Sequence, residues 1–125
     1  MVRDMDESLA FYCDILDYRI VVEKRVTDAT SIETMGLDGH DGFRLIYLKP
    51  NADFPSHPFA ASDISLAQPY GGTPIKKPTD VCHGKKTRIG QIVMSQQVQD
   101  LDAITAKVRA GRYCVVSSLR PSATG

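Results

Sequence analysis

The sequence Val-Arg-Asp-Met-Asp-Glu-Ser at residues 2–8 begins a helix-like stretch that ends before the apolar run at residues 20–22. A related sequence, Val-Gln-Asp-Leu-Asp-Ala-Ile at residues 98–104, begins a second such stretch before the apolar run at residues 114–116. The two helix starts and the two strand starts are separated by nearly the same length of chain. Such spacing predicts two copies of one supersecondary module, which can face each other and enclose a pocket.

The composition is that of a soluble globular domain. The chain has 125 residues, of which 42% are apolar and 24% charged, and its formal net charge is zero. This balance gives no electrostatic reason to expect a nucleic acid or an anionic membrane as a partner. No apolar run is long enough for a membrane span, and no signal peptide is visible. Three cysteines without metal-type spacing indicate thiols in a reducing compartment, so we expect a cytoplasmic protein.

Helix and strand signals alternate along the chain. Asp4 is the expected N-cap of the first helix, with an apolar stripe at three- and four-residue spacing along it. A strand is expected at residues 18–26, a helical turn at 28–36, and further strands at 43–49 and 64–68, the last ended by Pro69. After a connector at 73–88, the strand at 89–95, the helix capped by Asp100 and the strand at 112–119 repeat the order. The apolar stripe of the first helix comprises Met5, Leu9, Tyr12, Cys13 and Leu16, and the inward residues expected in the later helix are Leu101, Ile104 and Val108.

The motif at residues 2–22, Val-x-Asp-Met-Asp-x-Ser-Leu-Ala-Phe-Tyr-Cys-Asp-Ile-Leu followed by Arg-Ile-Val-Val, resembles the vicinal oxygen chelate superfamily. This superfamily includes glyoxalase I, extradiol dioxygenases and the bleomycin resistance proteins, and residues 90–116 resemble its second module. The resemblance implies an α+β fold of paired βαβββ modules whose curved, mixed sheets form a cup. We expect the first module at residues 1–72, the connector at 73–88 and the start of the second module at 89–125. Strands at both ends of this pattern are missing, which predicts a fragment of a longer chain or sheets completed by a partner chain.

The resemblance also implies a divalent metal, Zn, Ni, Fe or Mn, held by His and Glu side chains at the centre of the cup. Its strand patterns put Ser65 in a glutamate position and, with a small gap, Gln91 in a histidine position. A serine hydroxyl is a poor ligand for a divalent metal and a glutamine oxygen is a weak one, so this half of the site is degraded. The remaining ligand positions lie beyond the ends of the sequence, and the catalytic base is unknown.

Other candidate residues follow from their positions. Arg44 and Tyr47 lie on opposite sides of one predicted strand, so we expect one of them to line the concave face and bind a ligand. The three histidines, His40, His57 and His83, are expected in loops.

Three classes of function therefore stay open. The first is a metal-dependent lyase, isomerase or dioxygenase that acts on a small oxygenated molecule. The second is a metal-free protein that binds and sequesters a small organic molecule, as a resistance protein does. The third is a structural or regulatory member of the superfamily. Whichever holds, we expect a homodimer with a small-molecule ligand in the cleft between the modules.

Overall fold

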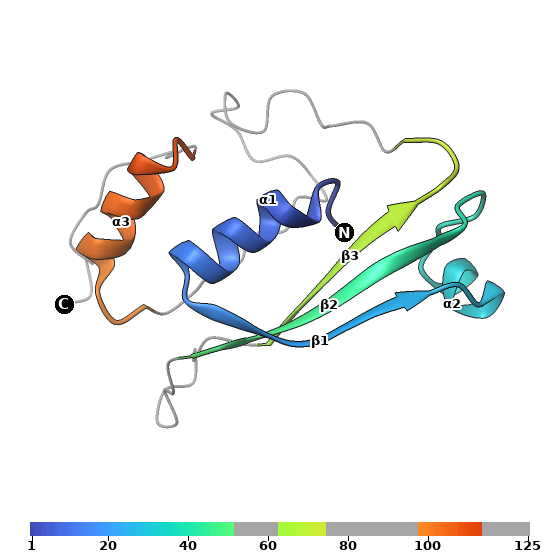
Figure 1. The fold of residues 1–125 in the computed structure, drawn as a ribbon, viewed down its shortest axis with the longest axis horizontal. Coiled ribbons are helices and arrows are strands. Elements are labelled where there is room, and N and C mark those ends of the chain that lie inside the picture. The colour runs from blue at the N-terminus through green and yellow to red at the C-terminus, as the bar shows by residue number, and fades with distance from the viewer. Residues whose placement is uncertain (52–62, 75–97, 114–125) are drawn as a thin grey trace, which may run out of the picture.

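The computed structural model describes residues 1–51, 63–74 and 98–113. A helix lies across one face of an antiparallel sheet in which β2 is central, and a second long helix lies beside the first (Figure 1). This arrangement is α+β, as the sequence predicts. In the described ranges, no helix is long and apolar enough to cross a membrane. The elements are, in order, α1 (Met5–Leu9), the π-helix η1 (Ala10–Ile15), β1 (Tyr18–Val26), α2 (Ala29–Thr34), β2 (Gly42–Pro50), β3 (Ile64–Tyr70) and α3 (Leu101–Ala110).

Each α-helix begins at an aspartate whose carboxylate accepts a backbone hydrogen bond three residues further on. The distances are 3.0 Å from Asp4 to the Glu7 N–H, 2.8 Å for Asp28 and 2.9 Å for Asp100. Such caps satisfy amides that have no partner inside the helix. The predicted caps at Asp4 and Asp100 are therefore confirmed, and the helical turn expected at residues 28–36 is α2.

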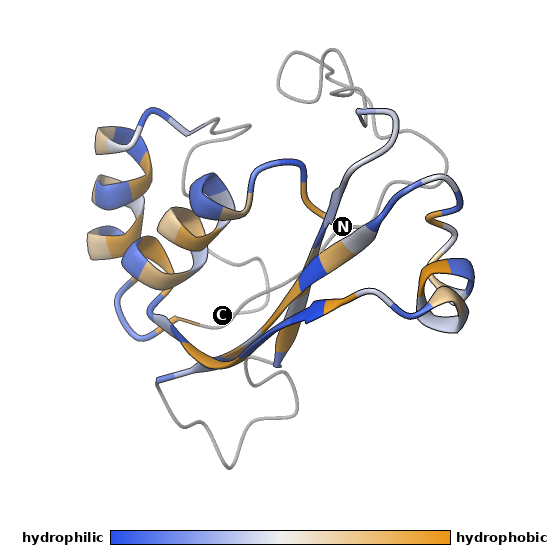
Figure 2. Ribbon diagram, turned by 45° about the vertical axis from the view of Figure 1, so that its right-hand side comes forward, coloured by the Kyte–Doolittle hydropathy of each residue, from blue (hydrophilic) through white to orange (hydrophobic). Residues whose placement is uncertain are grey.

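The main hydrophobic core lies between α1, η1 and the sheet (Figure 2). Met5, Ile46 and Leu48 have no exposed surface, and the rest of the predicted helix stripe packs against them. The first helix does not stay α-helical: it continues as the π-helix η1, which ends at Ile15 and is followed by Asp17 in the left-handed region, with φ of 58°. The core residues that are completely or almost completely buried are Met5, Tyr18, Ile46, Leu48 and Leu66.

β1 contains an irregularity that reverses which side chains face the helix. Ile20 pairs with Leu48, but Val22 pairs with Tyr47, so one extra residue of β1 lies between them. Such a β-bulge changes the alternation of the strand. Tyr18 and Ile20 therefore lie on the same side as the helix, whereas Val22 and the alternate residues after it lie on the other side.

Two sequence predictions about the ends of elements are wrong. β3 does not stop before Pro69 but continues to Tyr70, with Pro69 opposite Phe43. Proline is tolerated there because β3 is the outer strand of the described sheet, where a missing N–H need not break a ladder. In α3, Ile104 and Val108 are half-buried as expected, but Leu101, in the first turn of the helix, is 54% exposed.

The second half of the predicted repeat lies mostly outside the described residues. The expected strand at 89–95 lies there entirely, and of the strand expected at 112–119 only Arg112 and Tyr113 are described. These two residues form the turn after α3, and the Tyr113 ring packs edge-on against Phe11 of η1 at 5.0 Å between centroids. The structure therefore supports the α+β class and one module's order of elements, while the pairing of two modules into a cup stays a prediction.

Candidate functional site

The sheet face away from α1, which we call the open face, carries three rows of side chains. Strand alternation and the register of β1, β2 and β3 define the rows. A second hydrophobic cluster, formed by Leu37, Phe43 and Ala67, covers only the end of this face that lies next to α2. Val26 and Leu45 are half-buried against this cluster, whereas Val22, at 44%, and Tyr47, at 39%, are exposed. The rows are Val22–Tyr47–Ser65, Lys24–Leu45–Ala67 and Val26–Phe43–Pro69.

A hollow of about 660 Å³ lies where α2 meets the open face. Its floor is apolar, from Val26, Phe43 and Leu45, and Tyr47 and Ser65 line it as well. The wall from α2 is mostly hydroxyl-bearing, and Met35 at its end is 41% exposed. A surface of this kind suits a ligand with an apolar body and a few hydrogen-bonding groups. The wall and rim residues are Lys24, Arg25, Thr27, Asp28, Thr30, Ser31, Thr34 and Met35.

The local sequence explains why α2 stands at this position. Asp28 caps its start, and Gly36, with φ of +66°, ends it. The Gly36 N–H donates to the Glu33 carbonyl and the Leu37 N–H to the Ile32 carbonyl, which is the Schellman arrangement. Leu37 and Ile32 then pack on the sheet in the second hydrophobic cluster. The cap, the glycine and the apolar pair together fix one wall of the hollow.

We expect Asp28→Ala to destabilise the protein, whereas Asp28→Asn, which can still cap the helix, retains most of the stability. The hydrogen bonds from Ser31 lower the pKa of Asp28 below its ordinary value of 3.8. A lowered pKa means that this stabilisation is fully present above the ordinary value and is lost as the pH falls through the folded-state value. Urea denaturation of the wild type and Asp28→Ala should thus give a difference that shrinks in acid. A difference that is the same at every pH would contradict a stabilising carboxylate.

The structure brings two of the predicted site residues together. Ser65 of β3 pairs directly with Tyr47 of β2, and both side chains lie on the open face. Side chains in such a cross-strand pair are about 5 Å apart at Cβ. The position that the resemblance assigns to a metal-binding glutamate therefore does face the hollow, and it holds a hydroxyl. Gln91, the other predicted metal ligand, lies outside the described residues.

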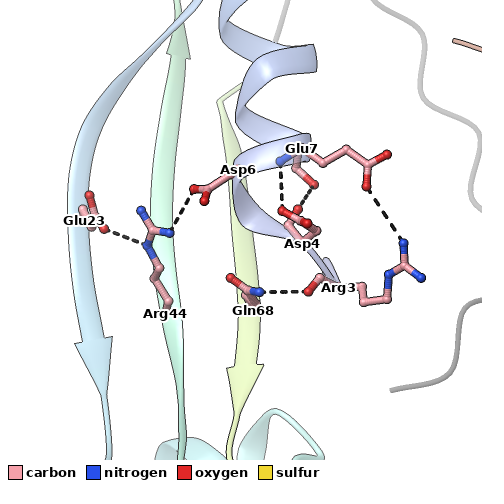
Figure 3. Close-up of polar contacts among 8 residues, drawn as sticks. Arg3, Asp4, Asp6, Glu7, Glu23, Arg44 and Gln68 are labelled. Carbon is pink, nitrogen blue, oxygen red and sulfur yellow. Dashed lines mark hydrogen bonds and ion pairs between the residues drawn. The ribbon is translucent and has the colours of Figure 1, made fainter. Parts of the chain in front are cut away.

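Arg44 lies on the opposite face, toward α1, where carboxylates bind its guanidinium (Figure 3). Its Nε donates to Glu23 at 2.7 Å, and its Nη1 lies 3.5 Å from Asp6. The hydrogen bond with Glu23 is also the main cause that raises the pKa of Arg44. Arg44 thus ties the helix to the sheet, and Tyr47 is the member of the predicted pair that lies on the open face.

His40 and Cys13, the histidine and the cysteine that the structure describes, do not line the hollow. The two ring nitrogens of His40 lie 3.2 Å from the Leu37 carbonyl and 3.1 Å from the Thr73 carbonyl, so this ring links two turns. Cys13 packs against the main core, and burial, together with the nearby Asp14 carboxylate, raises the pKa of its thiol. His57 and His83 lie outside the described residues.

The residues on the open face do not fit the metal that the resemblance implies. The three rows contain no His, Asp, Glu or Cys, and among the described residues no group of three or more such side chains could hold a metal ion. The only ionic side chain in the rows is the cation Lys24. Sequence reasoning missed Lys24, because without the bulge in β1 its position would be on the side of Tyr18.

The order of elements, the helix that covers one face of the sheet and the rows of side chains on its open face match the resemblance seen in residues 2–22. A family model described as Glyoxalase/Bleomycin resistance protein/Dioxygenase superfamily matches residues 1–125. No curated protein and no solved structure matches the chain. Because the family model matches the chain from end to end, the protein belongs to the glyoxalase/bleomycin resistance protein/dioxygenase superfamily.

Proposed function

We propose that this protein binds a small organic molecule on the open face, in the hollow beside α2, without using a metal. The observation that carries the proposal is the row Val22–Tyr47–Ser65, in which a hydroxyl occupies the superfamily's carboxylate position. Burial of apolar ligand surface against Leu45, Tyr47 and Met35, which line the hollow, would supply most of the binding free energy, at about 25 cal/mol per Å². The hydroxyls of Tyr47 and Ser65 would orient the ligand by hydrogen bonds.

The hydroxyls of Tyr47 and Ser65 are available to form hydrogen bonds with a ligand. Among the described residues, neither the Tyr47 hydroxyl nor the Ser65 hydroxyl takes part in a hydrogen bond within the protein. A polar group that is already exposed loses little when a ligand replaces its water, and it rejects a ligand that cannot form the bond. This gives the hollow a basis for specificity.

The test is a substitution that fills the hollow without disturbing the core. Ser65 is exposed and lies in a strand, so Ser65→Phe should fold normally while its ring occupies ligand space. We expect about tenfold weaker binding of the fluorescent apolar probe N-phenylnaphthylamine, which corresponds to about 1.4 kcal/mol. Ser65→Thr, which keeps the hydroxyl and suits a strand, should bind as the wild type does. The melting temperatures of the variants show whether they are folded.

Equal binding by the wild type and Ser65→Phe would contradict the proposed site, since the ring must then lie outside the probe's position. Absence of any saturable binding by the wild type would contradict the proposed function itself.

The second candidate is a metal-dependent lyase or dioxygenase of the superfamily. Membership in a superfamily that contains such enzymes favours it. It requires ligands outside the described residues, because Ser65 provides only a neutral oxygen. The metal content of the purified protein, measured together with ligand binding, distinguishes the two candidates.

A further inference from the structure

We propose that the ligand is an organic anion and that the ammonium of Lys24 supplies, on the open face, the positive charge that a metal supplies in other members of the superfamily. This inference rests on the proposed function and specifies the chemical class of its ligand. It predicts a carboxylate, sulfonate or phosphate group attached to an apolar body.

Lys24 lies close enough to Tyr47 and Ser65 to act on the same ligand group. Lys24 pairs with Leu45, and Tyr47 is two residues further along β2 on the same face. Diagonal neighbours of this kind are about 7–8 Å apart, within reach of long side chains. Lys24 carries its charge on a flexible four-carbon chain with three rotatable donors. The ammonium can therefore approach an anionic group that also accepts hydrogen bonds from the hydroxyls of Tyr47 and Ser65.

Lys24 differs from the other cations of the sheet in the partners that its charge has. Two other cations of the sheet are paired with carboxylates: Arg44 binds Glu23 and Asp6, and Lys49 lies 3.6 Å from Asp63. Arg19 lies 3.2 Å from the Asn51 side-chain oxygen, and the Arg25 guanidinium lies 5.4 Å from the centre of the Tyr70 ring. In the part of the chain that the structure describes, no carboxylate lies within ion-pair distance of Lys24.

Asp28 is the carboxylate that lines the same hollow. Its side chain is held at the start of α2 by the Ser31 N–H at 2.8 Å, and Lys24 contributes only a minor electrostatic effect to it, after the hydrogen bonds from Ser31. Asp28 therefore completes the helix cap and does not neutralise the ammonium. The unpaired positive charge beside an apolar floor is complementary to an amphipathic anion.

The other side chains of the three rows on the open face also suit an anion with an apolar body. Val26, Phe43 and Leu45 form the floor, and no acidic side chain interrupts the three rows. The exposed ammonium of Lys24 would repel a cationic ligand, whereas an uncharged ligand would gain no electrostatic attraction from it. The open face thus favours an anion over a neutral molecule of the same shape.

The experiment compares two probes that differ only in charge. Anilinonaphthalenesulfonate is N-phenylnaphthylamine with an added sulfonate, so both test the same apolar body. We expect Lys24→Met to weaken binding of the sulfonate about fivefold, which is the effect of an exposed ion pair near the upper end of its range. The uncharged probe should bind the variant and the wild type equally. Lys24→Arg should retain most of the affinity for the sulfonate.

The matched control is Lys49→Met, which removes a lysine from the same face of the same sheet. Lys49 is already paired with Asp63, so its loss should leave the affinity for the sulfonate unchanged. Equal weakening by Lys24→Met and Lys49→Met would overturn the inference, because the effect would then be general charge. If Ser65→Phe weakens both probes but Lys24→Met weakens neither, the anion inference is wrong and the proposed function stands. If neither probe binds the wild type, both are wrong.

Discussion

Ile46→Ala is expected to lower the free energy of unfolding by about 3–4 kcal/mol, the cost of a cavity in a fully packed core. Ile46 has no exposed surface and contacts the core formed by Met5, Leu48 and their neighbours between α1 and the sheet. Its truncation removes apolar contacts from both layers at once. Urea denaturation followed by circular dichroism measures the loss.

Leu45→Ala is the control in the adjacent residue. Leu45 lies on the open face and is only half-buried. We therefore expect Leu45→Ala to lower the free energy of unfolding by about 1–2 kcal/mol, less than the truncation of a completely buried side chain. Equal losses at the two positions, or a larger one at Leu45, would contradict the assignment of the two faces. If Ile46→Ala does not fold, Ile46→Val should give about 1 kcal/mol.

Gly72→Ala is expected to destabilise the protein by about 2–3 kcal/mol, because left-handed backbone and a steric overlap coincide there. Gly72 has φ of +66°, and a Cβ at this position would overlap the Gly39 carbonyl oxygen and lie 3.2 Å from the His40 Cα. These are backbone atoms that cannot rotate away. The change would push apart the turn that enters β2 and the turn that leaves β3.

Gly36→Ala separates the cost of a left-handed backbone from the cost of the steric overlap. Gly36 has the same φ of +66°, but nothing lies within 4 Å of an added Cβ. The expected loss is about 1 kcal/mol, the conformational cost alone. Thermal and urea denaturation of the two variants provide the comparison. If Gly72→Ala were no more harmful than Gly36→Ala, the close approach of the two turns would be contradicted.

Local patterns were sufficient to predict most elements of the described part of the fold. The Asp4 cap, the apolar stripe after it and the β-branched run at residues 18–26 each act within a few residues, so the sequence carries the signal directly. The π-helical end of the first helix was not predicted. Over so few residues, the same apolar pattern fits an α-helix and a π-helix, so the sequence does not distinguish them. The extension of β3 through Pro69 was missed because it depends on β3 being the outer described strand.

The candidate site was harder to predict, since it depends on which face each strand presents. Alternation along β2 put Arg44 and Tyr47 on opposite sides but did not say which side α1 covers. The bulge after Ile20 reverses the alternation of β1 and brings Lys24 to the open face. A bulge of this kind has no clear sequence signal here, because Ile20, Val21 and Val22 are all apolar. Only the register with β2 reveals it.

The most direct test of metal-independent binding is one titration of the purified protein with N-phenylnaphthylamine after exhaustive chelation, with the metal content of the same sample measured by mass spectrometry. We expect saturable binding in a sample that contains no stoichiometric metal, and an unchanged affinity when Zn, Ni, Fe or Mn is added. Binding that appears only with one metal ion per chain would contradict the account and identify the protein as a metal-dependent member of its superfamily.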